Sequence, residues 1–213
     1  MPLDAFNALT RQRALALRGD LSRAAASRPP GAPVTLELGC GHGHFLTALA
    51  QTRPERLCLG VDLLADRLAR AARKSARAGL KNIHWLQADA LALLDNLPPE
   101  LAPDEVFALF PDPWPKRRHW KNRLLAAPLL DRLADKLPPG ARLFFRTDHA
   151  PYFDAARRLA GTRPEWEIRP ASEWPFELET VFQKRAAAFQ SLVLRLRHNP
   201  PPRPVSPAAS PAG

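Results

Sequence analysis

The sequence lacks several features that would assign it to a common class of protein. Its 213 residues contain no apolar run near the roughly 20 residues that a membrane-spanning helix requires. The first residues, Met-Pro-Leu-Asp-Ala-Phe-Asn, lack the basic and apolar stretches of a secretory signal peptide. The two cysteines, Cys40 and Cys58, are too few for a disulfide framework or a zinc site. We therefore expect a cytoplasmic, reduced protein with no membrane and no metal.

Acidic residues are scarce relative to basic ones. The chain has 31 Lys and Arg against 21 Asp and Glu, which gives a net charge of +10. A basic surface of this kind can simply be solvated, but it also suits a polyanionic partner. Five of the cations lie within residues 116–123, and this local excess favours nucleic acid as the partner.

Apolar segments of strand and helix character alternate along most of the chain. This alternation predicts an α/β fold with a doubly wound, mostly parallel sheet and helices on both faces. The predicted strands are 34–38, 57–62, 83–87, 106–110, 142–146, 166–169 and 191–196. The predicted helices are 4–26, 45–51, 64–78, 91–97, 125–136, 150–160 and 180–188.

The composition also divides the chain into three parts. Residues 1–30 form a basic N-terminal helix and a linker, and residues 31–198 form the sheet-containing domain. Residues 199–213 are rich in Pro and Ala and cannot bury a core, so we expect them to be disordered. Nothing in the sequence decides whether the N-terminal helix packs on the domain or contacts a partner, or what the oligomeric state is.

A glycine-rich turn follows the first predicted strand and opens a helix. It reads Glu37-Leu38-Gly39-Cys40-Gly41-His42-Gly43-His44, so His44 replaces the last glycine of a dinucleotide fingerprint. Gly39 and Gly41 let the backbone approach a nucleotide-like ligand closely. The acid at Glu37 suits a cationic ligand better than a pyrophosphate, which favours S-adenosylmethionine over NAD. His42 and His44 have no third ligand nearby, so we interpret them as loop residues rather than metal ligands.

Two further acids end predicted strands. Asp62 ends the second strand, where an acid can accept hydrogen bonds from the ribose hydroxyls of a nucleoside. Asp89 follows the third strand and can receive an adenine amino group. Either side chain can instead cap the helix that follows it.

The fourth predicted strand runs into an unusual loop, which reads Phe-Pro-Asp-Pro-Trp-Pro-Lys-Arg-Arg-His-Trp-Lys-Asn-Arg over residues 110–123. Its three prolines exclude a helix and a sheet ladder at 111–115, so the loop should hold Asp112 and Trp114 rigidly. The fourth strand normally neighbours the first, at the edge where ligands bind. Trp114 can stack on a base or simply plug the loop. The cations Arg117, Arg118, Lys121 and Arg123 should bind phosphates rather than read bases.

Together these motifs resemble the bacterial tRNA (guanine-N7)-methyltransferase family, a class I S-adenosylmethionine-dependent family with a Rossmann-like seven-stranded sheet. The resemblance covers residues 34–197, and the Pro-Asp-Pro-Trp-Pro-Lys-Arg-Arg-His run is specific to this family. It implies methylation of N7 of guanosine 46 in the variable loop of tRNA. It implies cofactor contacts by four acids, Glu37, Asp62, Asp89 and Asp112. It implies substrate contacts by Lys116, Asp148 and the segment beginning at Thr180.

The sequence departs from the family pattern at three positions. The family carries Thr-x-Tyr/Phe-Glu where this chain has Thr180-Val181-Phe182-Gln183, so an amide replaces a carboxylate. Gln183 can still accept one hydrogen bond from the guanosine. Trp120 and Asn122 stand where relatives usually have His or a basic residue.

The chemistry needs no general base, because guanine N7 has an exposed lone pair. Rate should come from positioning and electrostatics. Asp112, our catalytic candidate, and Asp148 would favour the positive charge that develops on the purine, although Asp148 can also cap the next helix. Other readings are methylation of an exocyclic amine and a non-catalytic RNA-binding protein with the same fold. Further cations on the 64–78 helix either extend the RNA path or form a solvated face: Arg67, Arg70, Lys74 and Arg77.

Overall fold

A computed structural model describes residues 3–178 and 188–198 of the chain, with side chains from residue 12 onward. The predicted helix 180–188 and the tail 199–213 therefore lie outside the described residues, apart from residue 188. No described helix is long and apolar enough to cross a membrane.

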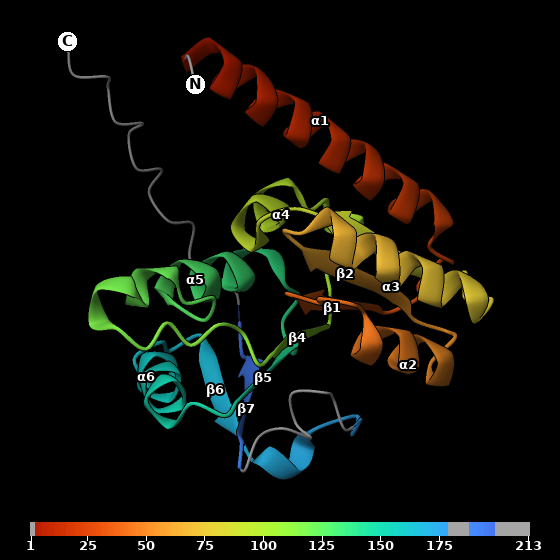
Figure 1. The fold of residues 1–213 in the computed structure, drawn as a ribbon. Coiled ribbons are helices and arrows are strands. Elements are labelled where there is room, and N and C mark those ends of the chain that lie inside the picture. The colour runs from red at the N-terminus through yellow and green to blue at the C-terminus, as the bar shows by residue number, and fades with distance from the viewer. Residues whose placement is uncertain (1–2, 179–187, 199–213) are drawn as a thin grey trace.

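The sheet has seven strands in the order β3-β2-β1-β4-β5-β7-β6 (Figure 1). Among the described strands, β7 runs antiparallel to both of its neighbours, β5 and β6, and the other pairings are parallel, so the prediction of a mostly parallel sheet is confirmed. The strands are β1 Val34–Leu38, β2 Leu57–Asp62, β3 Ile83–Gln87, β4 Glu105–Leu109, β5 Arg142–Thr147, β6 Trp166–Arg169 and β7 Gln190–Leu196. The predicted strand bounds differ from these by one residue at most.

The helices also follow the predicted pattern. They are α1 Leu3–Ser27, α2 His44–Thr52, α3 Ala65–Arg77, α4 Ala90–Asn96, α5 Ala127–Lys136 and α6 Ala150–Gly161. Three short 3-10 helices were not predicted: η1 Pro99–Leu101, η2 Arg117–Asn122 and η3 Ala171–Glu173. The second of these, η2, begins only after the last proline of the 110–116 loop, because the prolines exclude a helix before it.

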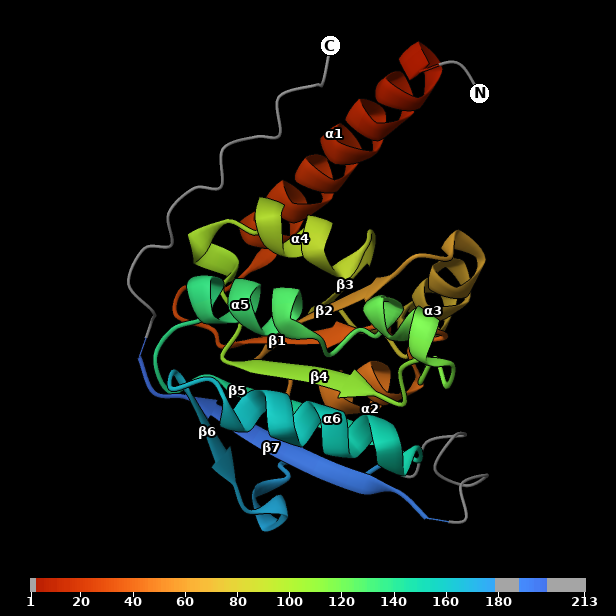
Figure 2. The ribbon, with the colours of Figure 1, turned by 90° about the vertical axis from the view of Figure 1, so that its left-hand side faces the viewer.

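The two faces of the sheet are covered differently. One face packs against α1, α4, α5 and α6 and forms the larger hydrophobic core (Figure 2). The other face packs against α2, beside which α3 lies, and against residues 174–178, which we call the covering segment. In the covering segment, Trp174 contacts Phe107 and Phe144 edge-on, with ring centroids 6.1 and 5.5 Å apart.

Helix α1 packs on the domain through its C-terminal half. Leu17, Leu21 and Ala24 are buried in the larger core, whereas Leu15 is 68% exposed. The Arg28 guanidinium, just beyond the helix, donates to the carbonyl of Ala32 over 2.7 Å. The rest of the helix extends away from the sheet (Figure 1). The question that the sequence left open is thus answered for the C-terminal half of α1.

Candidate functional site

The glycine turn joins β1 to α2 in a left-handed backbone. Gly39 and Gly41 have φ angles of 73° and 54°, which disfavour any side chain. The Gly41 N–H donates to Oδ2 of Asp62 over 2.9 Å, and this bond ties the turn to the end of β2. Backbone groups at the turn are thereby fixed in position next to the carboxyl ends of two adjacent strands.

Glu37 lies buried beneath this turn, near the end of β1 and just before the glycines, and is only 4% exposed. Within the described part of the chain, its Oε2 atom has no hydrogen-bond partner. The pKa of Glu37 is raised to about 8, chiefly by burial and to a smaller extent by the nearby Asp62 carboxylate, while the Leu46 backbone N–H and Lys74 act in the opposite direction. A buried carboxyl with one unsatisfied oxygen is suited to a cationic or hydrogen-bond-donating group of a ligand.

Asp62 is buried at the end of β2 and accepts two backbone hydrogen bonds. Its Oδ2 accepts from Gly41, and its Oδ1 accepts from the Leu64 N–H over 2.9 Å. Arg67 lies 3.9 Å from the same carboxylate. Each carboxylate oxygen has a second lone pair, so these contacts leave acceptor capacity for ligand hydroxyl groups.

Asp89 has the helix-capping role that the sequence left open. Its Oδ1 accepts from the N–H groups of Leu91 and Ala92, over 2.9 and 3.3 Å, at the start of α4. The side chain is exposed at the same edge of the sheet as Asp62. Capping uses Oδ1 alone, so the capping role does not prevent Oδ2 from meeting a ligand.

The loop from Phe110 to Lys116, which we call the proline loop, contains two residues with unusual backbone angles. Phe110 and Trp114 have φ angles of 48° and 44°, in the left-handed region that non-glycine residues rarely adopt. Such conformations cost roughly 1–3 kcal/mol each and are concentrated at functional sites. The Phe110 N–H donates to the Arg146 carbonyl over 2.8 Å, which aligns the loop with the end of β5. Asp112 is exposed between the two strained residues.

Trp114 is half-buried, and its ring meets His119 edge-on, with centroids 5.7 Å apart. The contact packs the proline loop against η2. It is compatible with a packing role and leaves part of the indole accessible to a base.

The cations after the proline loop divide into two groups. Lys116, Arg117, Arg118 and Lys121 are exposed on or beside η2, as expected for phosphate-binding side chains. Arg123 is different: it is only 6% exposed and lies between two rings, with its guanidinium carbon 4.4 Å from the Trp120 centroid and 4.7 Å from that of Tyr152.

Arg123 also donates from Nε to the Pro113 carbonyl over 2.8 Å. The assignment of Arg123 to RNA binding is therefore corrected, because its guanidinium is held inside the loop. Arg123 thus holds the proline loop in place through its stacking on the two rings and its hydrogen bond to the Pro113 carbonyl. A basic run in the sequence gives no sign of which cation turns inward.

Asp148 is exposed directly after β5. The residue that caps α6 is His149, whose Nδ1 accepts from the Tyr152 N–H over 3.1 Å. The alternative reading of Asp148 as the helix cap is therefore wrong, and its carboxylate is available at the edge of the sheet that also bears Asp112. Thr180 and Gln183 lie outside the described residues.

Sequence reasoning missed Arg146, which is 4% exposed at the end of β5. Its two terminal nitrogens donate to both carboxylate oxygens of Glu177, over 2.9 and 2.8 Å. Its guanidinium lies over the rings of Trp174 and Phe189, at 3.9 and 4.6 Å from the centroids. This arginine therefore joins the covering segment to the strand that precedes Asp148. Arg146 and Glu177 are 31 residues apart in the chain, so no local pattern indicated the contact.

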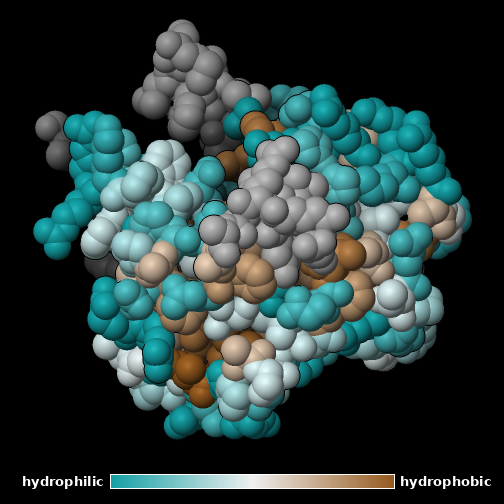
Figure 3. All heavy atoms as spheres, turned by 60° about the horizontal axis from the view of Figure 1, so that its bottom comes forward, coloured by the Kyte–Doolittle hydropathy of each residue, from teal (hydrophilic) through white to brown (hydrophobic). Residues whose placement is uncertain are grey.

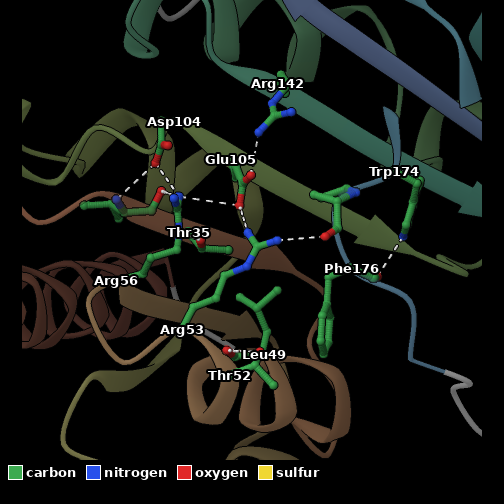
Figure 4. A network of polar contacts seen from close by, with 12 residues as sticks. Thr35, Leu49, Thr52, Arg53, Arg56, Asp104, Glu105, Arg142, Trp174 and Phe176 are labelled. Atoms are coloured by element: carbon green, nitrogen blue, oxygen red, sulfur yellow. Dashed lines mark hydrogen bonds and ion pairs between the residues drawn. The ribbon is translucent and has the colours of Figure 1, made fainter. Parts of the chain in front are cut away.

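The covering segment has a second attachment at the opposite edge of the sheet (Figure 4). Arg53 donates to the Pro175 carbonyl over 2.8 Å and to Glu105 over 3.0 Å. Glu105 is only 2% exposed and also accepts from Arg142 over 2.7 Å. This polar network lies at the amino ends of β4 and β5, so its role is to hold the segment rather than to bind a ligand at the site.

The strand order brings the candidate residues to one edge of the sheet. Strands β2, β1, β4 and β5 are consecutive and parallel, so their carboxyl ends meet along this edge. Ligands of doubly wound sheets bind there, where the strand order reverses. The edge carries, in order across the sheet, Asp62, Glu37 with the glycine turn, Asp112 and Asp148. Among the described residues no group of three His, Cys, Asp or Glu side chains could hold a metal ion.

Comparisons with known proteins identify relatives. The chain is 35% identical over 177 residues to the tRNA (guanine-N(7)-)-methyltransferase of Thermus thermophilus, covering 81% of this chain and 57% of that protein. It is 36% identical over 160 residues to the protein of the same name from Chloroflexus aggregans, covering 74% and 70%. The chain thus spans little more than half of the Thermus protein.

A solved structure shows the same fold. It is a point mutant of the 16S rRNA (adenine(1408)-N(1))-methyltransferase from Catenulisporales acidiphilia, with the cosubstrate SAM. The TM-score is 0.56 at 21% identity, with 88% of this chain and 94% of that chain covered. The Methyltransf_4 family model, which describes a methyltransferase, matches residues 31–196. That match extends over most of the chain, and the protein therefore belongs to the Methyltransf_4 methyltransferase family.

Proposed function

We propose that this protein transfers a methyl group from S-adenosylmethionine to N7 of guanosine 46 in tRNA. The proposal rests chiefly on the side chain of Glu37, which is buried beneath a glycine turn and leaves one carboxyl oxygen without a hydrogen-bond partner among the described residues. The names of the relatives from Thermus and Chloroflexus support the substrate class.

The residues present fit S-adenosylmethionine. The open Oε2 of Glu37 suits the amino group of the methionine part, and this contact would favour the ionised carboxylate. The left-handed Gly39 and Gly41 leave space for close approach, since a Cβ placed on either would meet no atom within 4 Å. Asp62 and Asp89 would hold the ribose and the adenine, and Asp112 would contact the cofactor from the proline loop. When bound, S-adenosylmethionine supplies an electrophilic methyl group on a sulfonium.

The protein's own residues would orient the guanine and stabilise its charge. N7 has a lone pair at neutral pH, so the site needs to remove no proton before transfer. The ring gains positive charge as N7 is methylated, and the exposed carboxylates of Asp112 and Asp148 would stabilise that charge. Lys116 would meet the nucleoside, and the strained backbone on either side of Asp112 would hold the geometry in advance.

Thr180 and Gln183 complete the proposed guanosine contacts. Gln183 would accept one hydrogen bond from the base and offer one donor, where the family's glutamate offers only acceptors. Outside the pocket, Arg117, Arg118 and Lys121 would bind RNA phosphates through η2. Arg123 has no part in this RNA contact.

The direct test incubates the protein with labelled S-adenosylmethionine and unmodified tRNA, followed by digestion and nucleoside analysis. We expect label in 7-methylguanosine, and a tRNA with adenosine in place of guanosine 46 should accept none. Label in an exocyclic-amine product would indicate the competing methylation reaction. Binding without any product would indicate a non-catalytic RNA-binding protein.

Asp112→Ala tests the proposed catalytic side chain. We expect turnover to fall by roughly 100–1,000-fold, the range seen when an electrostatic stabiliser is removed, while tRNA binding stays near the wild-type value. Single-turnover rates and filter binding separate the two quantities. Asp154→Ala on α6, an exposed acid far from the proline loop in the chain, serves as the matched control. Unchanged turnover in Asp112→Ala would remove Asp112 from the mechanism.

A further inference from the structure

Helix α3 carries an unusual concentration of cations. Five of its 13 residues are Arg or Lys, and its only acid is Asp66 in the first turn. We call the cations the α3 basic face: Arg67, Arg70, Arg73, Lys74 and Arg77. The four arginines are exposed, and Lys74 is half-buried.

These cations repel one another along the helix. Residues three or four apart on a helix are neighbours, and like charges at that spacing are destabilising. Arg70 has Arg73 and Lys74 at these positions, and Arg73 has Arg77. A helix face that is merely exposed to solvent typically carries alternating acidic and basic residues, which form salt bridges with one another. This repulsion lowers the stability of α3, and no interaction within the helix compensates for it.

Some arginines elsewhere on the surface form ion pairs. Arg132 meets Asp95 at 2.6 Å, and Arg163 meets Asp131 at 3.1 Å. On the α3 basic face, the nearest acid to an arginine is Asp62, 3.9 Å from Arg67. No ion pair within the described residues involves Arg70, Arg73 or Arg77. Their charge is therefore available to an external anion.

The face has a shape and a location that suit phosphate. Arg70, Arg73, Lys74 and Arg77 line one surface hollow, so several donors converge on the same space. Lys74 donates to the carbonyl of His42 over 2.8 Å, which places one end of the hollow beside the glycine turn. The side of the molecule where α3 lies is largely hydrophilic (Figure 3).

We propose that the α3 basic face binds backbone phosphates of the tRNA, as a second contact separate from η2. The two elements lie on either side of the site-bearing edge of the sheet, since α3 follows β2 and η2 follows β4 (Figure 1). A folded RNA whose nucleoside enters between them can touch both. This inference rests on the proposed tRNA substrate and extends the RNA-binding surface beyond the site.

The test compares two variants that each remove two exposed arginines. Arg70→Gln/Arg73→Gln changes the α3 basic face, and Arg157→Gln/Arg158→Gln changes α6 as the matched control. Affinity for unmodified tRNA is measured by filter binding without cofactor between about 50 and 200 mM salt, a range over which phosphate contacts weaken binding by orders of magnitude. The slope of log affinity against log salt should become shallower by about 1–2 in the α3 variant, and the control should match the wild type.

Methylation kinetics and a vesicle-binding assay of the same variants keep the inference separable from the proposed function. In methylation assays the α3 variant should show a KM for tRNA raised about 10-fold or more, in line with lost phosphate contacts, with kcat at saturating tRNA and the cofactor Kd unchanged. An equal loss in both variants, or none in either, would overturn the inference. Binding to anionic lipid vesicles is measured for both variants as well. If the α3 variant lost vesicle binding but kept the wild-type salt slope for tRNA, the inference would also be overturned. If no 7-methylguanosine forms but the slope still changes only in the α3 variant, the RNA contact stands and the proposed reaction fails.

Discussion

At the scale of single residues, the buried carboxyl of Glu37 makes the free protein sensitive to pH. Its pKa of about 8 lies well above the ordinary value of 4.5, because burial disfavours the charged form. Between these two values the folded state holds a proton that the unfolded state has lost. Stability contributed by this group is therefore fully present at low pH and falls as the pH rises toward 8.

Glu37→Gln should remove that dependence. We expect the free energy of unfolding of the wild type, relative to the variant, to fall between about pH 5.5 and 7.5 by up to about 1.4 kcal/mol per pH unit. Urea unfolding of both proteins at these two pH values measures the difference. Other titrating groups, such as His84, are common to both proteins and cancel. Parallel pH profiles would mean that Glu37 is already ionised in the free protein.

Arg123 gives a second prediction at this scale, because its role differs from that of its neighbours. Arg123→Ala removes the contact with Pro113 and the stacking on Trp120 and Tyr152, so it should destabilise the fold by about 1.5–3 kcal/mol. Turnover should fall while the salt slope of tRNA binding stays the same. Arg117→Ala/Arg118→Ala should do the reverse and make that slope shallower. A shallower slope in Arg123→Ala would place its charge on the RNA after all.

The roles of individual side chains were also the hardest features to predict from the sequence. Glu37, Asp62 and Asp112 could be placed because each lies at or just beyond the end of a strand, and strand ends are visible as apolar runs that stop. The inward turn of Arg123 depends on where Tyr152 packs, almost 30 residues later. The left-handed backbone of Phe110 and Trp114 left no signal either, since neither residue type favours it.

At the scale of elements, the covering segment is the least predictable part of the described structure. It forms no helix or strand, and two arginines on different elements hold it: Arg53 beyond α2 and Arg146 in β5. The strands were predictable because buried parallel strands are short apolar runs, and their bounds agree within one residue. This segment is attached by one ion pair and one hydrogen bond to arginines far away in the chain, and by Trp174 and Phe176, so it has no such periodicity.

The Arg146–Glu177 pair should be coupled to activity. Arg146→Lys keeps the charge but loses the paired hydrogen bonds and the planar stacking, so we expect lower stability and lower kcat with an unchanged cofactor Kd. A double-mutant cycle with Glu177→Gln should give a coupling energy of about 0.5–3 kcal/mol in unfolding. Glu173→Gln, in the nearby pair with Arg169, is the control. A coupling near zero would show that the stacked rings alone hold Arg146.

At the scale of the whole molecule, the C-terminal half of α1 is part of the domain. Leu21 is 2% exposed in the larger core and Leu15 is 68% exposed on the same helix. Leu21→Ala should destabilise the protein by about 2–5 kcal/mol, as expected for a buried leucine. Leu15→Ala should stay within about 0.5 kcal/mol of the wild type. Thermal unfolding of both variants is the measurement, and equal effects would mean that α1 is not packed as described.

Trp85 on β3 has a consequence for how this sequence can change over evolutionary time. A Cβ on Gly43 would lie 2.3 Å from the Trp85 ring, and one on Gly60 would lie 2.5 Å from it. The indole also donates to Ser75 over 3.1 Å, so it has little freedom to move aside. Positions 60 and 85 should therefore covary among homologues, and alanine at 60 should accompany a smaller residue at 85. Gly43 should stay glycine whatever stands at 85, because its φ of 65° disfavours any side chain.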